Sequence, residues 1–135
     1  MTKFMLLMNM DGGNCDTPML EWDKADMDAH MKYLGDHVER LRQSGELVEV
    51  NALSWPKHAK VVRSTGVSAP VLTDGPYAES KEILAGYTMV DVESEERALE
   101  IAAEQSAAPG PGGVPLEQPI EVRRLMESDG DLHDF

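Results

Sequence analysis

Between positions 23 and 44, apolar residues recur at alternating spacings of four and three, which is the periodicity of one helix face. Gly45 follows this segment, where a left-handed cap would end a helix. The pattern predicts a helix from about Asp23 to Ser44 that packs on the core through one apolar stripe. The stripe consists of Met27, Met31, Leu34, Val38 and Leu41.

Four further segments have patterns typical of β-strands. Positions 3–10 form a nearly continuous apolar run, as a buried strand does, and positions 46–53 alternate apolar and polar residues. Positions 83–92 carry β-formers at their centre, and positions 120–125 form a last short strand.

A hairpin is predicted between the second and third of these strands. Positions 60–64 and 70–73 are short β-like pieces on either side of Gly66. The Asp-Gly-Pro triplet at positions 74–76 is a strong turn signal that leads into the next strand.

A second helix is predicted to begin after Ser94, which is suited to cap it. Glu95 and Glu96 fall in its first turn, where carboxylates interact favourably with the helix dipole. The segment 107–119 is rich in proline and glycine and is predicted to be a loop. The apolar positions of this helix are Ala98, Leu99, Ile101 and Ala102.

The order of these elements defines the fold class. A β-α-β unit, a hairpin insertion and a second β-α-β unit predict an α+β domain with the ferredoxin-like split βαβ arrangement and an antiparallel sheet. Two helices cover one sheet face, and no third helix is predicted for the other, so we expect a second copy to cover it in a homodimer. We expect residues 1–127 to form a single domain and residues 128–135 a flexible acidic tail.

The charge and the cysteine content exclude several classes of function. The 135 residues include 12 Lys and Arg against 25 Asp and Glu, a net charge of −13, which disfavours nucleic acids and anionic membranes as partners. Cys15 is the only cysteine, which excludes an internal disulfide and a multi-cysteine metal site. The apolar runs are too short for a membrane helix or a signal peptide, so a cytoplasmic location is expected.

The most distinctive segment is TDGPYAESKEILAGY, at positions 73–87. It resembles the DGPFAETKE signature of the DGPF branch of the YCII-related family, with Tyr77 in place of Phe and Ser80 in place of Thr. The likeness covers roughly Phe4 to Leu125. Upstream, Leu53, Pro56, Ala59, Val62 and Arg63 resemble that branch's approach to the signature.

The resemblance implies a bacterial protein with a ferredoxin-like α+β fold, paired as a dimeric α+β barrel. It does not imply one activity. Members of the family are suspected of acid–base chemistry through a His and Asp pair. The DGPF branch often accompanies extracytoplasmic-function sigma factors, which suggests a regulatory or accessory role, and related dimeric barrels act on small, often aromatic or lactone, substrates.

Three residues are candidates for proton transfer. Asp74 lies at a strand end, where its carboxylate would accept a proton at a cleft mouth or, alternatively, cap its own turn. His30 and His37 are seven residues apart and share a helix side with Asp26 and Tyr33, next to the apolar stripe. This row either lines a cleft or is a partly exposed helix edge. The spacing is too wide for both histidines to bind one metal ion, so no metal is expected, and no cofactor is indicated.

Three residues are candidates for binding a substrate. Lys81 and Arg63 would hold an anionic group, although Lys81 is equally suited to an ion pair with Asp74 that fixes the turn. The hydroxyl of Tyr77 would alter the shape and polarity of a pocket.

Two hypotheses of function follow, and the sequence leaves open whether the protein is an enzyme. In the first, it is a small-molecule enzyme of lyase or isomerase type, with Asp74 or a histidine as base near the Asp-Gly-Pro turn and a small organic anion as substrate. In the second, it is a non-catalytic ligand-binding or regulatory accessory module, in which the signature builds a turn and a dimer contact.

Overall fold

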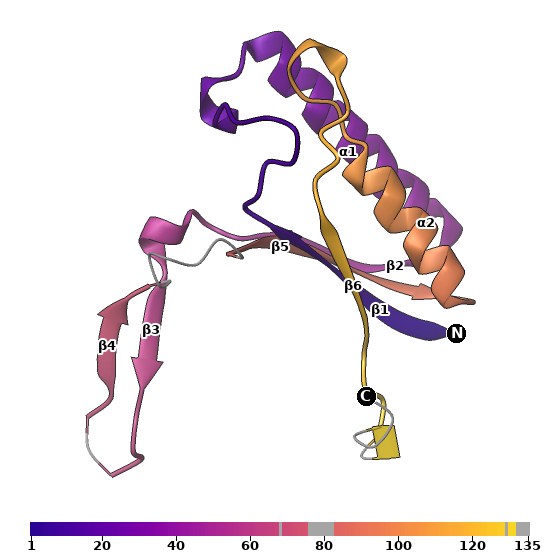
Figure 1. The fold of residues 1–135 in the computed structure, drawn as a ribbon. Helices are drawn as coiled ribbons and strands as arrows, with labels where there is room; N and C mark the ends of the chain where they lie inside the picture. Colours follow the sequence, from indigo (N-terminus) through magenta and orange to yellow (C-terminus); the bar gives the residue numbers. More distant parts are fainter. Residues whose placement is uncertain (68, 76–82, 129, 132–135) are drawn as a thin grey trace.

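The computed structural model of the chain places two helices on one face of an antiparallel sheet (Figure 1). The structure describes residues 1–67, 69–75, 83–128 and 130–131. Short 3₁₀ turns connect the main elements at Met19–Glu21 (η1), Pro56–His58 (η2) and Pro111–Gly113 (η3). The helices and strands are β1 (Thr2–Asn9), α1 (Lys24–Ser44), β2 (Leu47–Ala52), β3 (Lys60–Arg63), β4 (Val71–Asp74), β5 (Leu84–Val92), α2 (Glu95–Ser106) and β6 (Ile120–Arg124).

The sheet has the strand order β2-β5-β1-β6, and every neighbouring pair is antiparallel. Strand β5 lies between β1 and β2, so the first β-α-β unit is split by a strand of the second, as the element order predicts. Strands β3 and β4 form a separate antiparallel hairpin. The predicted α+β class, the antiparallel sheet and the hairpin insertion are confirmed.

Local signals in the sequence set the helix ends. Gly45 adopts a left-handed conformation with φ of 80° and ends α1, where its backbone N–H donates to the carbonyl groups of Arg42 and Leu41. The hydroxyl of Ser94 accepts a hydrogen bond of 3.1 Å from the backbone N–H of Arg97 and caps α2. Both predicted caps are confirmed.

The buried face of α1 differs from the predicted stripe. Met31 is 57% exposed, whereas His30 and His37 are only 3% and 1% exposed and lie on the same side of α1 as the core residue Leu41. The prediction of Met31 as a core residue was therefore wrong, and so was the alternative that the histidines form a partly exposed edge. The physical reason is that α1 packs sideways against α2 and the loop that contains η3, which turns the histidine side inward.

The face of the sheet opposite the helices is apolar at its centre. Phe4, Leu6 and Val90 are buried beneath the helices, so the residues that alternate with them point to the other side. Within the described ranges no helix covers that side, since both helices lie on the other one (Figure 1). We call this surface the open face. Its central residues are Met5, Leu7, Tyr87 and Met89, which pair across β1 and β5 and are each partly exposed.

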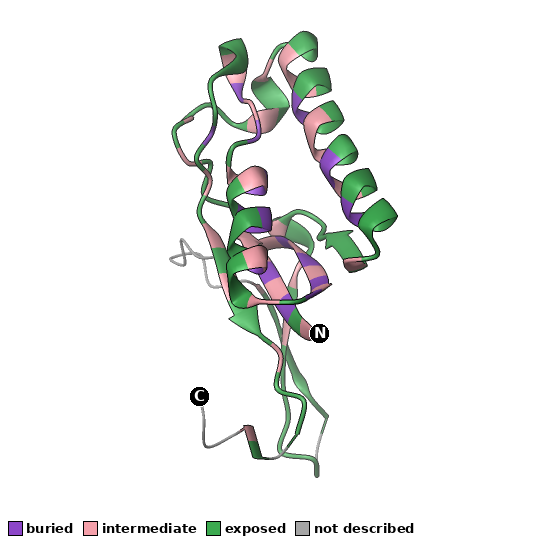
Figure 2. Cartoon of the chain, turned by 90° about the vertical axis from the view of Figure 1, so that its right-hand side faces the viewer, coloured by how far each residue is buried: buried purple, intermediate pink, exposed green. Residues whose placement is uncertain are grey.

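The hairpin of β3 and β4 extends away from the domain on the side of the open face (Figure 1). We call residues 60–74 the arm, of which position 68 lies outside the described residues. Val62 and Leu72 lie opposite each other in the register and are 59% and 64% exposed, and Val71 is 60% exposed. Figure 2 shows the exposed colour along almost all of this hairpin, in contrast to the buried strips on the helices.

Candidate functional site

The row of polar residues on α1 meets the C-terminal end of α2 and the loop after it. At the N-terminal end of the row, the carboxylate of Asp26 accepts a hydrogen bond of 3.2 Å from the backbone N–H of Gly112. Nδ1 of His30 lies 3.0 Å from the carbonyl oxygen of Pro109. Because a carbonyl oxygen only accepts, Nδ1 carries the proton. The ring of Trp22 stands edge-on to His30, with the ring centres 5.4 Å apart.

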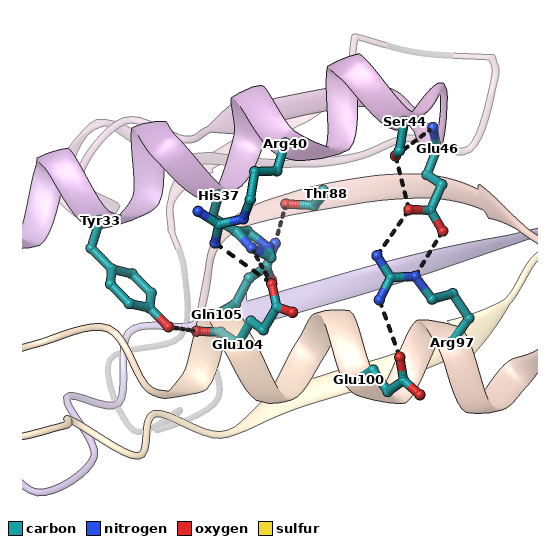
Figure 3. Close-up of polar contacts among 10 residues, drawn as sticks. All are labelled: Tyr33, His37, Arg40, Ser44, Glu46, Thr88, Arg97, Glu100, Glu104 and Gln105. Atoms are coloured by element: carbon teal, nitrogen blue, oxygen red, sulfur yellow. Dashed lines mark hydrogen bonds and ion pairs between the residues drawn. The ribbon is translucent and has the colours of Figure 1, made fainter.

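The C-terminal end of the row converges on one residue of α2 (Figure 3). The hydroxyl of Tyr33 donates to the backbone carbonyl of Glu104 over 2.8 Å, and Nδ1 of His37 lies 3.0 Å from the Glu104 carboxylate. The guanidinium of Arg40 is 3.8 Å from the same carboxylate. We call this contact zone of Asp26, His30, Tyr33 and His37 with residues 104–112 the seam.

His37 has the electrostatics of a neutral, enclosed imidazole. Burial lowers the pKa of His37 below its ordinary value, and the nearby carboxylate of Glu104 offsets this only in part. The neutral ring donates from Nδ1 to Glu104, which leaves Nε2 as an acceptor. Nε2 is buried and has no hydrogen-bond partner among the described residues. At 1% exposure, a substrate would reach this nitrogen only if the seam opened.

Asp74 lies far from the seam in the fold, at the end of β4 on the arm (Figure 1). Its side chain is 87% exposed and accepts a contact of 2.6 Å from Nζ of Lys60, its cross-strand neighbour. Arg63, at the other end of β3, is also exposed. One chain therefore brings Asp74 together with Lys60 and not with His30 or His37.

The two remaining candidate residues, Lys81 and Tyr77, lie outside the described residues, as does the proposed Asp74–Lys81 ion pair.

A cavity of about 250 Å³ lies between the loop before η1 and the loop around η3. The thiol of Cys15, at its wall, contacts the carbonyl of Thr17 at 3.6 Å, and none of the described residues that line the cavity is basic. The lining residues are Asn14, Cys15, Pro111, Val114, Pro115 and Leu116.

Glu104 is the residue of the seam that the sequence analysis missed. It lies 67 positions after His37 and has the sequence context of any acidic residue on an exposed helix side. No local pattern identifies it as a partner, because the contact depends on how α1 and α2 cross.

Within the described ranges, no three side chains of His, Cys, Asp or Glu gather as metal ligands do. None of the described helices has the length and apolarity to cross a membrane.

The fold defines the class of protein: a small split βαβ domain with an inserted hairpin, in which the described helices cover one face of the sheet (Figure 1). The sequence model of the YCII-related domain matches residues 2–114, which is most of the chain. The chain therefore belongs to the YCII-related domain family. The match includes both helices and all strands except β6. No curated protein matches the chain significantly.

Proposed function

We propose that the protein acts as a homodimeric ligand-binding or regulatory accessory module, in which the open faces of two copies pack together. The observation that carries this proposal is the apolar centre of the open face, formed by Met5, Leu7, Tyr87 and Met89. Two such faces packed together would form the closed α+β barrel that the family resemblance implies. An isologous contact uses the same surface on both copies, so one apolar patch is sufficient.

These four side chains are partly exposed in a single chain, so a second copy would remove further apolar surface from water. Covering the remaining exposed part of each contributes on the order of 1 kcal/mol, about half of what complete burial of a large apolar side chain contributes. Eight such side chains meet across the two copies. Their sum is large enough to offset a substantial part of the entropy lost on association.

The polar groups support binding better than catalysis. The histidines are enclosed in the seam with their Nδ1 atoms engaged, and Asp74 is exposed on the arm beside Lys60. Arg63 on the arm, together with Lys81 and Tyr77 of the DGPF-type signature, remains our proposed set for holding a small organic anion. Regulation linked to a sigma factor is the role that the DGPF resemblance favours for such a module.

Sedimentation equilibrium tests the proposed dimer. Met89→Lys places a charge at the centre of the open face, and we expect the dissociation constant of the dimer to rise by at least about 100-fold, or ~3 kcal/mol. Leu99→Lys is the matched control, since Leu99 is 50% exposed on α2. A wild-type dimer that survives Met89→Lys unchanged would show that another surface holds the copies together.

A second candidate is acid–base catalysis of lyase or isomerase type. The observation that favours it is the contact of 3.0 Å between Nδ1 of His37 and the Glu104 carboxylate, which orients a neutral imidazole as a base. Asp74 and His30 remain the other candidates for proton transfer. The test is the ¹⁵N chemical shift of His37 Nε2 during titration with small carboxylates and lactones. A shift that is lost in Glu104→Gln supports the candidate, and the absence of any response to the whole panel contradicts it.

A further inference from the structure

We propose that the arm of each protomer packs against the open face of the other protomer, so that two exchanged arms clasp the dimer. This inference rests on the proposed dimer and adds to it the partner of the arm. Contact between the two open faces alone would bring the two sheets together. The exchanged arms would place Asp74 and Arg63 of one chain over the sheet of the second chain, so that both chains contribute to any site there.

The first argument is the instability of the arm by itself. A two-stranded hairpin that packs on nothing is marginally stable in water. The arm nevertheless has a regular four-residue register from Lys60↔Asp74 to Arg63↔Val71. On one side of it, Val62 and Leu72 are adjacent and mostly exposed. A strand pair with such an apolar side is stable when another surface covers that side.

The arm also differs from the rest of the chain in charge. Residues 60–74 contain two basic residues (Lys60, Arg63) and one acidic residue (Asp74), so the arm carries +1 whereas the remaining residues of the −13 chain carry −14. The arm is therefore a basic projection from a strongly acidic domain. The acidic remainder of a second copy is its electrostatic complement, and the open face of that copy offers an apolar centre.

The third argument is an unpaired acceptor on the open face. Asp91 pairs in register with Lys3 and points to the same side as Met5 and Met89. Its Oδ1 is buried and has no hydrogen-bond partner in the part of the chain that the structure describes. A buried carboxylate oxygen without a donor is costly, and a guanidinium from a second copy would be favourable there once the Asp91 side chain turns outward to the open face. Arg63 forms no ion pair with the described residues and is a suitable donor from the partner's arm.

The dimensions and direction of the arm agree with this placement. At about 3.3 Å per residue, the leg from Lys60 to Gly66 reaches roughly 20 Å. A sheet of four strands spaced about 4.8 Å apart is roughly 15 Å wide between its outer strands. The arm extends on the side of the open face (Figure 1), so a copy packed there lies next to it.

Heterodimer-specific cross-linking tests the exchange directly. In a Cys15→Ser background, one preparation carries Arg63→Cys and a second carries Asp91→Cys. We expect the mixture, after oxidation, to give a disulfide-linked dimer that neither preparation gives alone. A dimer in sedimentation that gives no cross-link in the mixture overturns the exchanged arm while the open-face dimer stands. A wild-type chain that sediments as a monomer overturns both.

Substitutions on the apolar side of the arm provide the second readout. We expect Val62→Asp to raise the dimer dissociation constant at least about tenfold, and Val62→Thr, which keeps the strand-forming branched shape, to raise it severalfold. Leu99→Asp is the matched control with similar exposure on α2. Unchanged dissociation constants for both Val62 variants, with helix content kept in circular dichroism, would contradict the inference.

Discussion

The seam and the arm show opposite relations between residue chemistry and environment. The seam contains the histidines that the sequence marks as candidates for proton transfer, yet they are buried and their Nδ1 atoms are engaged by residues 104–109. The arm contains Asp74, the most distinctive acidic candidate, on a hairpin whose described residues are mostly exposed. The described residues of one chain therefore enclose the histidines of the seam and leave most of the arm uncovered. This difference suggests that the seam stabilises the domain and that the arm acts with a partner.

The largest effect on folding is expected in the seam. His37→Ala removes a completely buried ring and leaves the Glu104 carboxylate without its donor, so we expect the free energy of unfolding to fall by about 3 kcal/mol. Urea denaturation measures this change. His58→Ala is the control, since His58 is exposed, and should change stability by less than about 0.5 kcal/mol. Similar effects of the two variants would contradict a structural seam.

The next effect concerns the ion pair that connects Glu46, the residue before β2, to Arg97 of α2. Arg97 donates from two guanidinium nitrogens to the carboxylate of Glu46, over 2.8 and 2.9 Å (Figure 3). These hydrogen bonds lower the pKa of Glu46, whose side chain is 14% exposed. Arg97→Met would leave a mostly buried carboxylate with the Ser44 hydroxyl as its remaining donor, over 2.9 Å, and should cost about 2 kcal/mol of unfolding free energy. Lys24→Met, which breaks an exposed pair with Asp28, is the control and should cost almost nothing.

The pH dependence of stability tests the burial of His37 in the seam. The pKa of His37 is lowered by burial from an ordinary value of 6.5, so the folded state binds this proton less readily than the unfolded state. The contribution of the neutral His37 ring to the free energy of unfolding is therefore fully present above about pH 6.5 and decreases as the pH falls below this value. Urea midpoints between pH 5 and 8 measure the loss, and His37→Gln should flatten the curve in that range. An equally steep decline in His37→Gln would contradict the assignment.

The smallest effect on folding is expected at Asp74. Because its ion pair with Lys60 is exposed, Asp74→Ala should change the free energy of unfolding by less than about 0.5 kcal/mol. The substitution also makes the arm more basic, so the dimer should dissociate no more readily than the wild type. Thermal unfolding and sedimentation equilibrium check these two outcomes. A loss of several kcal/mol would show that the carboxylate has a structural role that exposure alone does not reveal.

The sequence predicted the fold because each element has a local signal. Gly45 ends α1 and Ser94 begins α2, as expected, and β5 alternates between buried and half-buried residues at its place inside the sheet. Strand β2 forms where its alternating pattern predicts, but it lies at the sheet edge, and its apolar residues Val48 and Val50 are exposed. The inward face of α1 was predicted less well. The apolar stripe through Met31 has a local period, but the face that is buried depends on where α2 and the η3 loop lie, and no local pattern encodes that.

The candidate site was predictable only in part, for the same physical reason. The grouping of His30 and His37 with Asp26 and Tyr33 follows from helical spacing, and all four contact the same neighbouring segment. Their partner Glu104 required the tertiary fold. The distance in the fold between Asp74 and the histidines depends on the direction of the arm, which hairpin signals do not specify.

The seam is buried within one chain, whereas we propose that the arm is covered only in the dimer. Hydrogen exchange of the wild-type chain, followed by mass spectrometry at two protein concentrations below and above the dimer dissociation constant, tests it most directly. We predict that peptides of the seam exchange at the same slow rate at both concentrations, whereas peptides covering 60–67 and 69–74 become protected at the higher one. Equal exchange of the arm at both concentrations, in a sample that sedimentation shows to dimerise, would contradict the account.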